Sequence, residues 1–272
     1  MIGIVWNSKK DGAEVLADYI VKWFTKRNIP ILVNEDNMFT EELNFIIVLG
    51  GDGTILHTVK RMHPYSIPLL GINLGNLGFL TAIEKNNIDY YLEQALDDSN
   101  YLIEKRMMLD VSICKDNVCI WKDTALNDIV LSRRSLSRIL NFCIEVSDNP
   151  IGNYYADGFI ISTPTGSTAY SLSAGGPILT PQMEAVALTP ICAHTLYARP
   201  MVVSAKEKVK LYLNEAFDEN VVTIDGQRRT KLTKGEELLV EASEIYAKII
   251  RFKDRSFFEV LAEKLVREVK DG

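Results

Sequence analysis

The first third of the chain alternates short apolar runs with segments of helical periodicity. The helical patterns cover 13–26 and the stretch that begins after Thr54. The apolar runs cover 2–6, 29–33, 45–49 and 68–72. Strands that alternate with helices are typical of a parallel sheet with crossover helices, so this part predicts an α/β domain.

From about residue 100 the pattern changes to short β-like runs separated by turn signals. These runs cover 109–114, 118–121, 129–131, 140–146, 159–162, 209–213, 221–224 and 245–250. Such spacing predicts an antiparallel β-sandwich.

Helical character returns in two places, after Pro181 and over 257–270. The second of these segments has an apolar face made by Phe258, Leu261, Leu265 and Val269. Because these side chains follow the helical period, we expect the last helix to pack back on a sheet. The predicted domains are 1–98 with 252–272, and 99–251.

Composition limits the classes of protein that fit. With 272 residues the chain exceeds the usual size of one core, so two domains are expected. A formal charge of -6 argues against a nucleic-acid partner. Neither a secretory signal after Met1 nor an apolar run of membrane-spanning length is seen, so we expect a cytoplasmic protein without a membrane partner.

Cysteines and histidines show no zinc pattern. The three histidines are far apart, and Cys114 and Cys119 flank a predicted turn at 115–117. In the expected compartment this pair should be reduced.

Asp52 is the most informative side chain, because it lies in Gly50-Gly51-Asp52-Gly53-Thr54 directly after the apolar run 45–49. Glycines let a ligand approach the backbone, and amides at a helix start bind phosphate oxygens. A carboxylate repels phosphate, so Asp52 is expected to accept a proton or to hold a metal ion. The alternative is a tight turn in which Asp52 caps the helix.

A second glycine-rich segment, Gly71 to Phe79, follows the next predicted strand. The carboxyl ends of parallel strands meet at one edge of a sheet. We therefore expect the two glycine segments to form two walls of one cleft.

The densest polar cluster is Thr163-Pro164-Thr165-Gly166-Ser167-Thr168-Ala169-Tyr170, which follows Asp157-Gly158 and a β-like run. Hydroxyls on Thr165, Ser167 and Thr168 suit an adenine edge, and Tyr170 could lie against a ring. The alternative is a Ser/Thr-rich turn with Thr168 as the cap of a helix.

Two shorter motifs are weaker by themselves. Asn127-Asp128 offers an amide for a base edge and a carboxylate for ribose hydroxyls, or else a turn at a strand edge. Asp225-Gly226 predicts a hairpin turn, with Gln227 as an exposed neighbour.

Taken together, these segments resemble the NAD kinase family in order and content, from about residue 45 to the C-terminus. Gly-Gly-Asp-Gly-Thr is shared with diacylglycerol, sphingosine and phosphofructokinase-type kinases, whereas the Thr163 to Tyr170 cluster is more specific. The remaining motifs that carry the resemblance are Asn73 to Phe79, Asn127-Asp128, Asp157-Gly158, Leu188 to Cys192 and Asp225-Gly226-Gln227.

The resemblance implies an N-terminal Rossmann-like domain and a C-terminal β-sandwich that binds NAD. It also implies transfer of phosphate from ATP to the adenosine ribose 2′-hydroxyl of NAD, giving NADP, with polyphosphate as an open alternative donor. A divalent cation, Mg²⁺, and a homo-oligomer, dimer or tetramer, are implied as well, and the metal ligands stay unassigned.

Asp52 falls on the family's catalytic aspartate. The nucleotide-binding residues that the resemblance implies are Gly53, His57, Asn127, Asp128, Arg138, Asp157, Thr168, Ala169, Tyr170, Ser171, Leu172, Ser173, Cys192 and Gln227. Asp128 is one methylene shorter than the glutamate that the family usually has. Tyr155 stands where some relatives carry arginine, so a cationic contact to the pyrophosphate is either missing or supplied by Arg138.

Two other classes share part of the pattern. A lipid kinase would share the glycine motif, but it would need an apolar tunnel in place of the polar Thr163 to Tyr170 cluster. A catalytically silent NAD-binding sensor would have no need of an intact Asp52.

Overall fold

The computed structural model describes residues 1–33, 39–75, 78–84, 87–134, 138–194, 197–215, 220–253 and 256–271, with the backbone alone at 84 and 265–271. The chain forms two compact units. Unit 1 is Met1–Lys105 with Ala247–Gly272, and unit 2 is Arg106–Tyr246.

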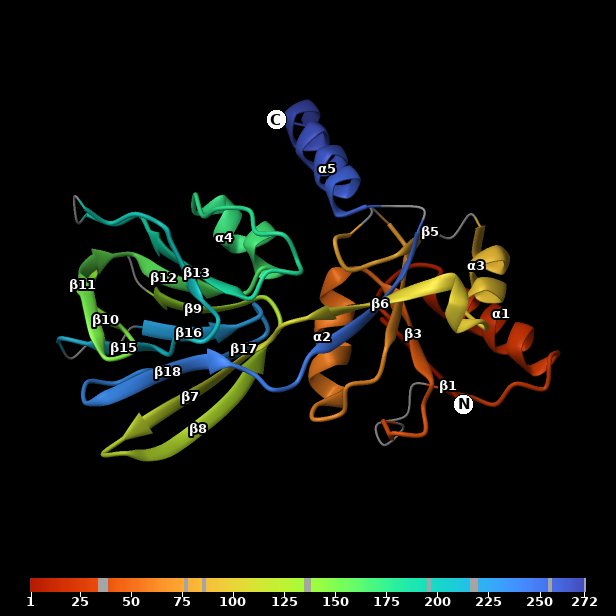
Figure 1. Ribbon diagram of the computed structural model, residues 1–272, viewed down its shortest axis with the longest axis horizontal. Coiled ribbons are helices and arrows are strands. Elements are labelled where there is room, and N and C mark those ends of the chain that lie inside the picture. The colour runs from red at the N-terminus through yellow and green to blue at the C-terminus, as the bar shows by residue number, and fades with distance from the viewer. Residues whose placement is uncertain are drawn as a thin grey trace. The chain divides into compact units, whose positions relative to one another are not determined.

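Unit 1 is built on a mixed sheet in the order β2-β1-β3-β4-β19-β6, with β5 paired to β4 (Figure 1). Its strands are β1 Ile2–Trp6, β2 Ile31–Val33, β3 Phe45–Gly50, β4 Leu69–Asn73, β5 Ile83–Glu84, β6 Tyr101–Arg106 and β19 Ala247–Phe252. The neighbours from β2 to β19 run parallel. The long apolar run of β3 is buried along its whole length, as expected for a strand covered on both faces.

Helices lie on both faces of this sheet. The helices of unit 1 are α1 Ala13–Thr25, α2 Asp52–Met62, α3 Ile88–Gln94 and α5 Phe257–Asp271. Side chains of α1 and α3 share one core with Ile47 of β3 and Ile72 of β4. On the other face, Gly71 of β4 lies so close to α2 that a Cβ there would be 2.7 Å from Ile55 Cδ1.

Unit 2 is a sandwich of two antiparallel sheets, in the orders β11-β10-β15-β18-β7-β8 and β14-β13-β12-β9-β16-β17 (Figure 1). Its first strands are β7 Leu109–Lys115, β8 Val118–Ala125, β9 Asp128–Arg133, β10 Leu140–Val146, β11 Asn149–Ala156 and β12 Gly158–Ser162. The later ones are β13 Ala185–Ile191, β14 Met201–Ser204, β15 Val209–Leu213, β16 Asn220–Ile224, β17 Arg228–Thr230 and β18 Glu236–Ala242. Two short helical turns, Gly166–Thr168 and α4 Tyr170–Ser173, follow β12.

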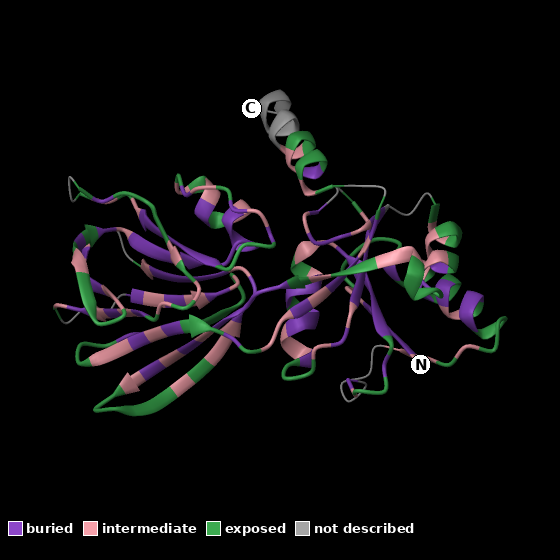
Figure 2. Ribbon diagram, in the orientation of Figure 1, coloured by how far each residue is buried: buried purple, intermediate pink, exposed green. Residues whose placement is uncertain are grey.

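The core of unit 2 lies between its two sheets. Alternate residues of β7 and β9 face inward, and an aromatic group forms the centre, where Phe142 stacks on Tyr154 at 5.7 Å between ring centroids. Figure 2 shows this layer as buried, while the outer sides of β7 and β8 are exposed or half-buried. This alternation is what a half-solvated antiparallel sheet requires.

The predicted fold class, a Rossmann-like parallel-sheet domain followed by an antiparallel β-sandwich, is confirmed. The predicted helix after Pro181 is wrong, because β13 begins at Ala185 and pairs with β12 and β14. Its residues up to Pro190 are buried, so sheet pairing overrides the helix-forming residues of that segment. The segments 99–105 and 247–251, assigned from sequence to the sandwich domain, fall in unit 1 with β6 and β19.

Two sequence motifs extend beyond the described residues. Asn76 and Leu77 of the second glycine segment lie outside them, as do the side chains of Leu265 and Val269 on the predicted face of the last helix. Of the helices that the structure describes, none combines the length and the apolar character needed to cross a bilayer.

Candidate functional site

The Asp52 carboxylate bonds to the second glycine segment. Its Oδ2 accepts a hydrogen bond from the Phe79 N–H at 2.8 Å, and its Oδ1 accepts one from the Leu80 N–H at 2.9 Å. Asp52 is only half-buried. The two segments that were expected to form two walls of one cleft are therefore joined directly by this side chain.

The helix that carries Asp52 begins earlier than the sequence predicts. Gly51, in an extended conformation, is the N-cap of α2, and Asp52 is the first helical residue. The alternative in which Asp52 caps the helix is therefore wrong. A negative charge in this first turn interacts favourably with the helix dipole.

Gly53 and His57 lie one turn apart on the exposed side of α2. The opposite side of the helix buries Ile55, Leu56 and Val59. This apolar anchoring fixes which way α2 presents both predicted nucleotide-binding residues.

In unit 2, Asp225 organises the loop that carries Asn127 and Asp128. Its carboxylate accepts hydrogen bonds from the N–H groups of Leu126 at 2.9 Å, Asn127 at 2.7 Å and Asp128 at 3.1 Å. Asp225 itself lies in the predicted hairpin turn between β16 and β17. The Asp225-Gly226 pattern predicts only a turn, so this role of Asp225 is visible in the structure alone.

The hairpin geometry explains why an aspartate can stand at this position. Asp225 and Gly226 have φ of 49° and 65°. The Gln227 N–H donates to the Ile224 carbonyl at 2.9 Å and closes the turn. Consecutive positive φ values are typical of a type I′ turn, in which Asp-Gly is a favoured pair.

Asp128 is almost fully buried, with 5% of its surface exposed. Burial and the neighbouring Asp225 carboxylate raise the pKa of Asp128 to about 7. Burial also raises the pKa of Asp225, although its three N–H donors act in the opposite direction. The raised pKa favours the protonated form of the Asp128 carboxyl, which can donate a hydrogen bond as well as accept one.

Asn127 leaves one polar atom without a protein partner. Its Oδ1 is buried and accepts no hydrogen bond from the residues that the structure describes. Its main-chain carbonyl, in contrast, accepts the Thr163 N–H at 2.9 Å. Because a buried unpaired acceptor is costly, this oxygen would be stabilised by a hydrogen-bond donor.

The Thr163 to Thr168 turn is held by its own hydroxyl groups. Thr163 Oγ1 donates to the Leu126 carbonyl at 2.6 Å. Ser167 Oγ donates to the Pro164 carbonyl at 2.7 Å and accepts the Leu179 N–H at 3.0 Å.

Thr165 and Ser167 are buried, and Thr165 Oγ1 accepts a hydrogen bond from Arg106 Nη1 at 3.3 Å. The interpretation of these two hydroxyls as adenine ligands is therefore wrong, because both are used inside the fold.

The predicted binding stretch Thr168 to Ser173 presents its side chains in different ways. Tyr170 is exposed over 47% of its surface, and Ser173 is exposed as well. Thr168, Ala169 and Leu172 are half-buried, and Ala169 rather than Thr168 precedes α4. Ser171 is buried, with its hydroxyl 3.0 Å from Thr189 Oγ1, so it offers support to the turn instead of a free hydroxyl.

Asp157 and Cys192 lie away from the Asn127 loop. The Asp157 carboxylate forms an ion pair with Arg133 at 2.9 Å, and its N–H donates to Ile191 next to exposed Cys192.

The β12 register places these two groups at opposite ends of the strand. Gly158 pairs with Ser132 of β9, whereas Ser162 pairs with Asp128. The structure thus brings Asn127, Asp128 and the Thr163 turn together, but not with Asp157. Arg138 and Gln227 are exposed.

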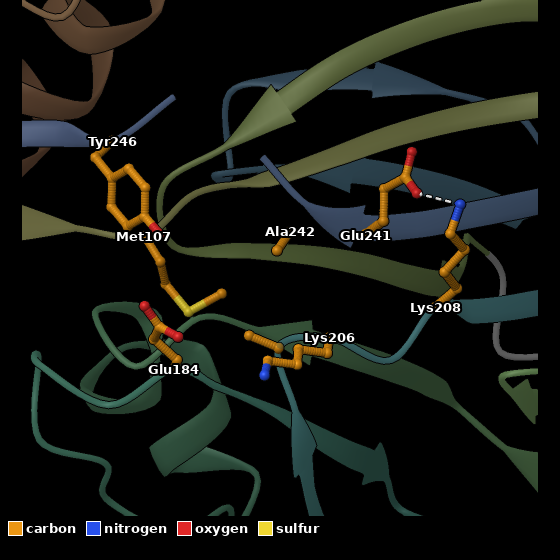
Figure 3. A pocket seen from close by; sticks show the side chains of 8 residues that line it. Met107, Glu184, Lys206, Lys208, Glu241, Ala242 and Tyr246 are labelled. Carbon is orange, nitrogen blue, oxygen red and sulfur yellow. Dashed lines mark ion pairs between the residues drawn. The ribbon is translucent and has the colours of Figure 1, made fainter. Parts of the chain in front are cut away.

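A cavity of about 320 Å³ opens at one edge of the sandwich (Figure 3). Its charged rim includes Lys208 and Glu241, which form an ion pair with each other at 2.7 Å. The residues that line it are Met107, Glu184, Ala205, Lys206, Lys208, Glu241, Ala242 and Tyr246. It contains none of the predicted site residues.

Metal-binding side chains are dispersed. Across the described part of the chain, no three His, Cys, Asp or Glu side chains gather where they could hold a metal ion. Within the described ranges, the protein thus offers isolated ligands such as Asp52.

An α/β unit with an acidic glycine turn at the end of a buried parallel strand, joined to a sandwich that carries a polar turn, defines a two-domain kinase of nucleotides. Sequence models of the ATP-NAD kinase family match the chain, the N-terminal domain over residues 36–101 and the C-terminal domain over 126–252. The NAD kinase of Thermoanaerobacter sp. (strain X514) is 38% identical over 97% of this chain and 98% of its own length. The chain belongs to the NAD kinase family.

Other relatives agree with this assignment. The NAD kinase of Carboxydothermus hydrogenoformans is 42% identical over 83% of this chain and 80% of its own length. An NAD kinase from Archaeoglobus fulgidus, solved in complex with ATP, has a TM-score of 0.77 and 28% identity, with 97% of both chains covered.

Yeast NADH kinase, solved with NADH, shares the fold at a TM-score of 0.84, with 24% identity over 97% of this chain and 86% of that one.

Proposed function

We propose that this protein transfers the terminal phosphate of ATP to the adenosine ribose 2′-hydroxyl of NAD, with Asp52 as the general base. The observation that carries this proposal is the Asp52 carboxylate, which is half-buried and held by the Phe79 and Leu80 N–H groups. Membership of the NAD kinase family supports the substrates, and the A. fulgidus relative solved with ATP supports ATP as donor.

In the proposed reaction, Asp52 takes the proton of the 2′-hydroxyl as the oxygen forms its bond to the γ-phosphorus. The bond from the γ-phosphorus to the bridging oxygen breaks, and ADP leaves. Each Asp52 oxygen accepts one backbone N–H and keeps acceptor capacity for the hydroxyl proton. General base catalysis of this kind contributes roughly 10² to 10⁴ in rate.

For the adenosine of NAD, we propose contacts from Asn127, Asp128 and Tyr170. The buried Asn127 Oδ1 would accept from the exocyclic amine of adenine, and the exposed Tyr170 ring would lie against the base. The Asp128 carboxyl, with its pKa near 7, would pair with a ribose hydroxyl. Ser171 is expected to support the turn through its buried hydroxyl, and the other predicted residues keep their assignment as nucleotide-binding.

A divalent cation fits this arrangement only with the help of the nucleotide. The dispersed acidic side chains support a cation held mainly by the phosphates of ATP, with Asp52 as a candidate ligand from the protein. Such a cation would neutralise charge on the phosphates. We propose Mg²⁺, and turnover with Mg²⁺, Mn²⁺ or EDTA tests this.

The family resemblance also supports a homo-oligomer, dimer or tetramer. Light scattering at assay concentrations measures the mass directly, and a monomer of 30.6 kDa would reject this part of the proposal.

The experiment for Asp52 compares Asp52→Asn with the wild type in a coupled assay for NADP, with ATP or polyphosphate as donor. We expect kcat to fall by about 10² to 10⁴ while NAD affinity is kept. The matched control is Asp97→Asn, because Asp97 also accepts a backbone N–H, from Ser99 at 2.9 Å, but is exposed near the end of α3. Near-normal turnover of Asp52→Asn would remove the base role.

The same assay separates an NAD kinase from both competing classes, and lipid phosphorylation and NAD binding separate those two. A lipid kinase would phosphorylate diacylglycerol or sphingosine and form no NADP. A sensor would bind NAD without forming NADP.

A further inference from the structure

Arg251 of β19 holds the segment that bonds to Asp52. Its Nη1 donates to the Thr81 carbonyl at 2.9 Å, and its Nη2 donates to the Phe79 carbonyl. Its Nε donates to Glu104 Oε2 at 3.2 Å, in an ion pair whose side chains are 19% and 15% exposed. One guanidinium thus spans two carbonyls of the short segment 78–81.

The same segment faces Asp52 with its amide groups. The Phe79 residue donates its N–H to Asp52 Oδ2, while its carbonyl accepts from Arg251. The Gly78 N–H donates to Thr81 Oγ1 at 2.9 Å, which closes the segment on itself. Arg251 and the Asp52 carboxylate therefore bond to the backbone of the same residue, Phe79.

The C-terminal helix covers the Phe79 side chain from another direction. The Phe257 ring centroid lies 6.0 Å from the Phe79 ring centroid. Lys264 Nζ lies 4.3 Å from the Phe79 ring centroid. These contacts hold the ring. The two carbonyls of the segment, in contrast, are held by Arg251.

Arginine suits this position for a physical reason. Its planar guanidinium presents several donors in a rigid fork, so it can bond two carbonyls and a carboxylate at once. Lysine offers one point charge on a flexible stem and could not keep all three partners in place. Glu104 in turn neutralises the charge of this largely buried group.

We propose that Arg251 is a positioning residue for phosphoryl transfer, which sets the place of the Asp52 carboxylate through the backbone of Phe79 and Leu80. This inference rests on the proposed role of Asp52. Without the guanidinium, the segment loses the donors to Phe79 and Thr81, and the carboxylate that it holds can shift. A displacement on the order of 1 Å at a catalytic group costs about 10²-fold in rate.

The test compares Arg251→Gln with Arg27→Gln in steady-state kinetics. Arg27 is a matched control in the same unit, because it also donates to a backbone carbonyl, that of Trp23, and pairs with a carboxylate, that of Glu93. It follows the C-cap of α1, and its partners Trp23 and Glu93 belong to α1 and α3. We expect kcat of Arg251→Gln to fall about 10²-fold with KM for ATP and NAD within about threefold of wild type, and kcat of Arg27→Gln to stay unchanged.

The second arm is a double-mutant cycle with Asp52→Asn. If Arg251 acts through Asp52, adding Arg251→Gln to Asp52→Asn lowers kcat no further. An equal loss in both backgrounds would show that Arg251 acts independently of Asp52 and would overturn the inference. Arg251→Gln could instead lower the melting temperature to the same extent as Arg27→Gln and leave kcat unchanged. That result would overturn the inference as well.

Arg251→Lys covers the case in which Arg251→Gln does not fold. It keeps the charge beside Glu104 but cannot span both carbonyls, so we expect an intermediate loss in kcat. Wild-type kcat in a folded Arg251→Lys would overturn the inference. Near-normal kcat of Asp52→Asn alone would instead reject the base role under the proposed function, so the two failures differ.

Discussion

Gly78 and Asp52 are in such close contact that no side chain fits between them. A Cβ atom on Gly78 would lie 1.9 Å from Asp52 Oδ1 and 2.5 Å from its Cγ. Real Cβ atoms do not approach other heavy atoms this closely. The position of the carboxylate therefore depends on the absence of a side chain at residue 78, in a segment 26 positions further along the chain.

Gly78→Ala should displace the Asp52 carboxylate and break at least one of its two backbone hydrogen bonds. We expect kcat to fall by about 10²-fold and stability to drop by about 1–3 kcal/mol from overpacking. Kinetics and urea unfolding measure both effects. Gly75→Ala is the stability control, because its Cβ would meet nothing within 4 Å, and it should change stability by less than about 0.5 kcal/mol.

Asp225→Ala should release the loop that carries Asn127 and Asp128. Three N–H groups lose their acceptor, so we expect a loss of about 3 kcal/mol or more in stability and a rise in KM for NAD. Asp116→Ala is the matched control, since Asp116 is an exposed hairpin residue that also has positive φ, 49°. Equal KM values for NAD in the two variants would contradict this role of Asp225.

Asp128 should make the stability of the protein fall as pH rises. Its pKa is raised from 3.8 to about 7 in the folded protein, so between these values the folded state binds more protons than the unfolded state. Ionisation of this carboxyl then lowers the free energy of unfolding across that window, by roughly 4 kcal/mol at most.

Asp128→Asn removes this titration without changing the shape of the side chain. The variant should gain stability relative to wild type on going from pH 4.5 to pH 8, as measured by denaturant unfolding at both values. A stability difference between variant and wild type that is the same at both pH values would refute the assignment.

Tyr170 and Ser171 are adjacent but should respond in opposite ways to substitution. Tyr170→Ala removes an exposed ring, so we expect KM for NAD to rise about 10-fold, from the loss of 1–3 kcal/mol of base stacking, with little change in melting temperature. Ser171→Ala breaks the buried hydroxyl pair with Thr189 and should cost about 1 kcal/mol of stability with KM nearly unchanged. A higher KM for NAD in Ser171→Ala, together with a loss of stability in Tyr170→Ala, would show that Ser171 contacts NAD and that Tyr170 supports the fold.

Sequence reasoning succeeded for the elements whose signals are local. The buried run before Gly50, the alternating strands Leu140–Val146 and Val209–Leu213, and the Asp225-Gly226 turn all follow from the properties of neighbouring residues. It failed after Pro181, where local helix formers are overruled by pairing of β13 with two strands from elsewhere in the chain.

Within the candidate site, residue type indicated chemistry but not bonding partners. The hydroxyls of Thr165 and Ser167 were expected to face a nucleotide, yet both are used inside the turn. Asp225 and Arg133 were missed because their partners, at Leu126 to Asp128 and at Asp157, are distant in sequence.

By itself, the amino-acid sequence determined the two kinds of sheet, the acidic glycine turn and the family, because periodicity and motif order are properties of neighbouring positions. Tertiary structure alone decided that Asp52 bonds to Phe79 and Leu80, that Asp225 organises the Asn127 loop, and that Arg251 holds the segment beside Asp52. Hydrogen bonds between residues tens to hundreds of positions apart depend on how strands are ordered in a sheet. That order arises from the packing of the whole domain and leaves no local signal in the chain.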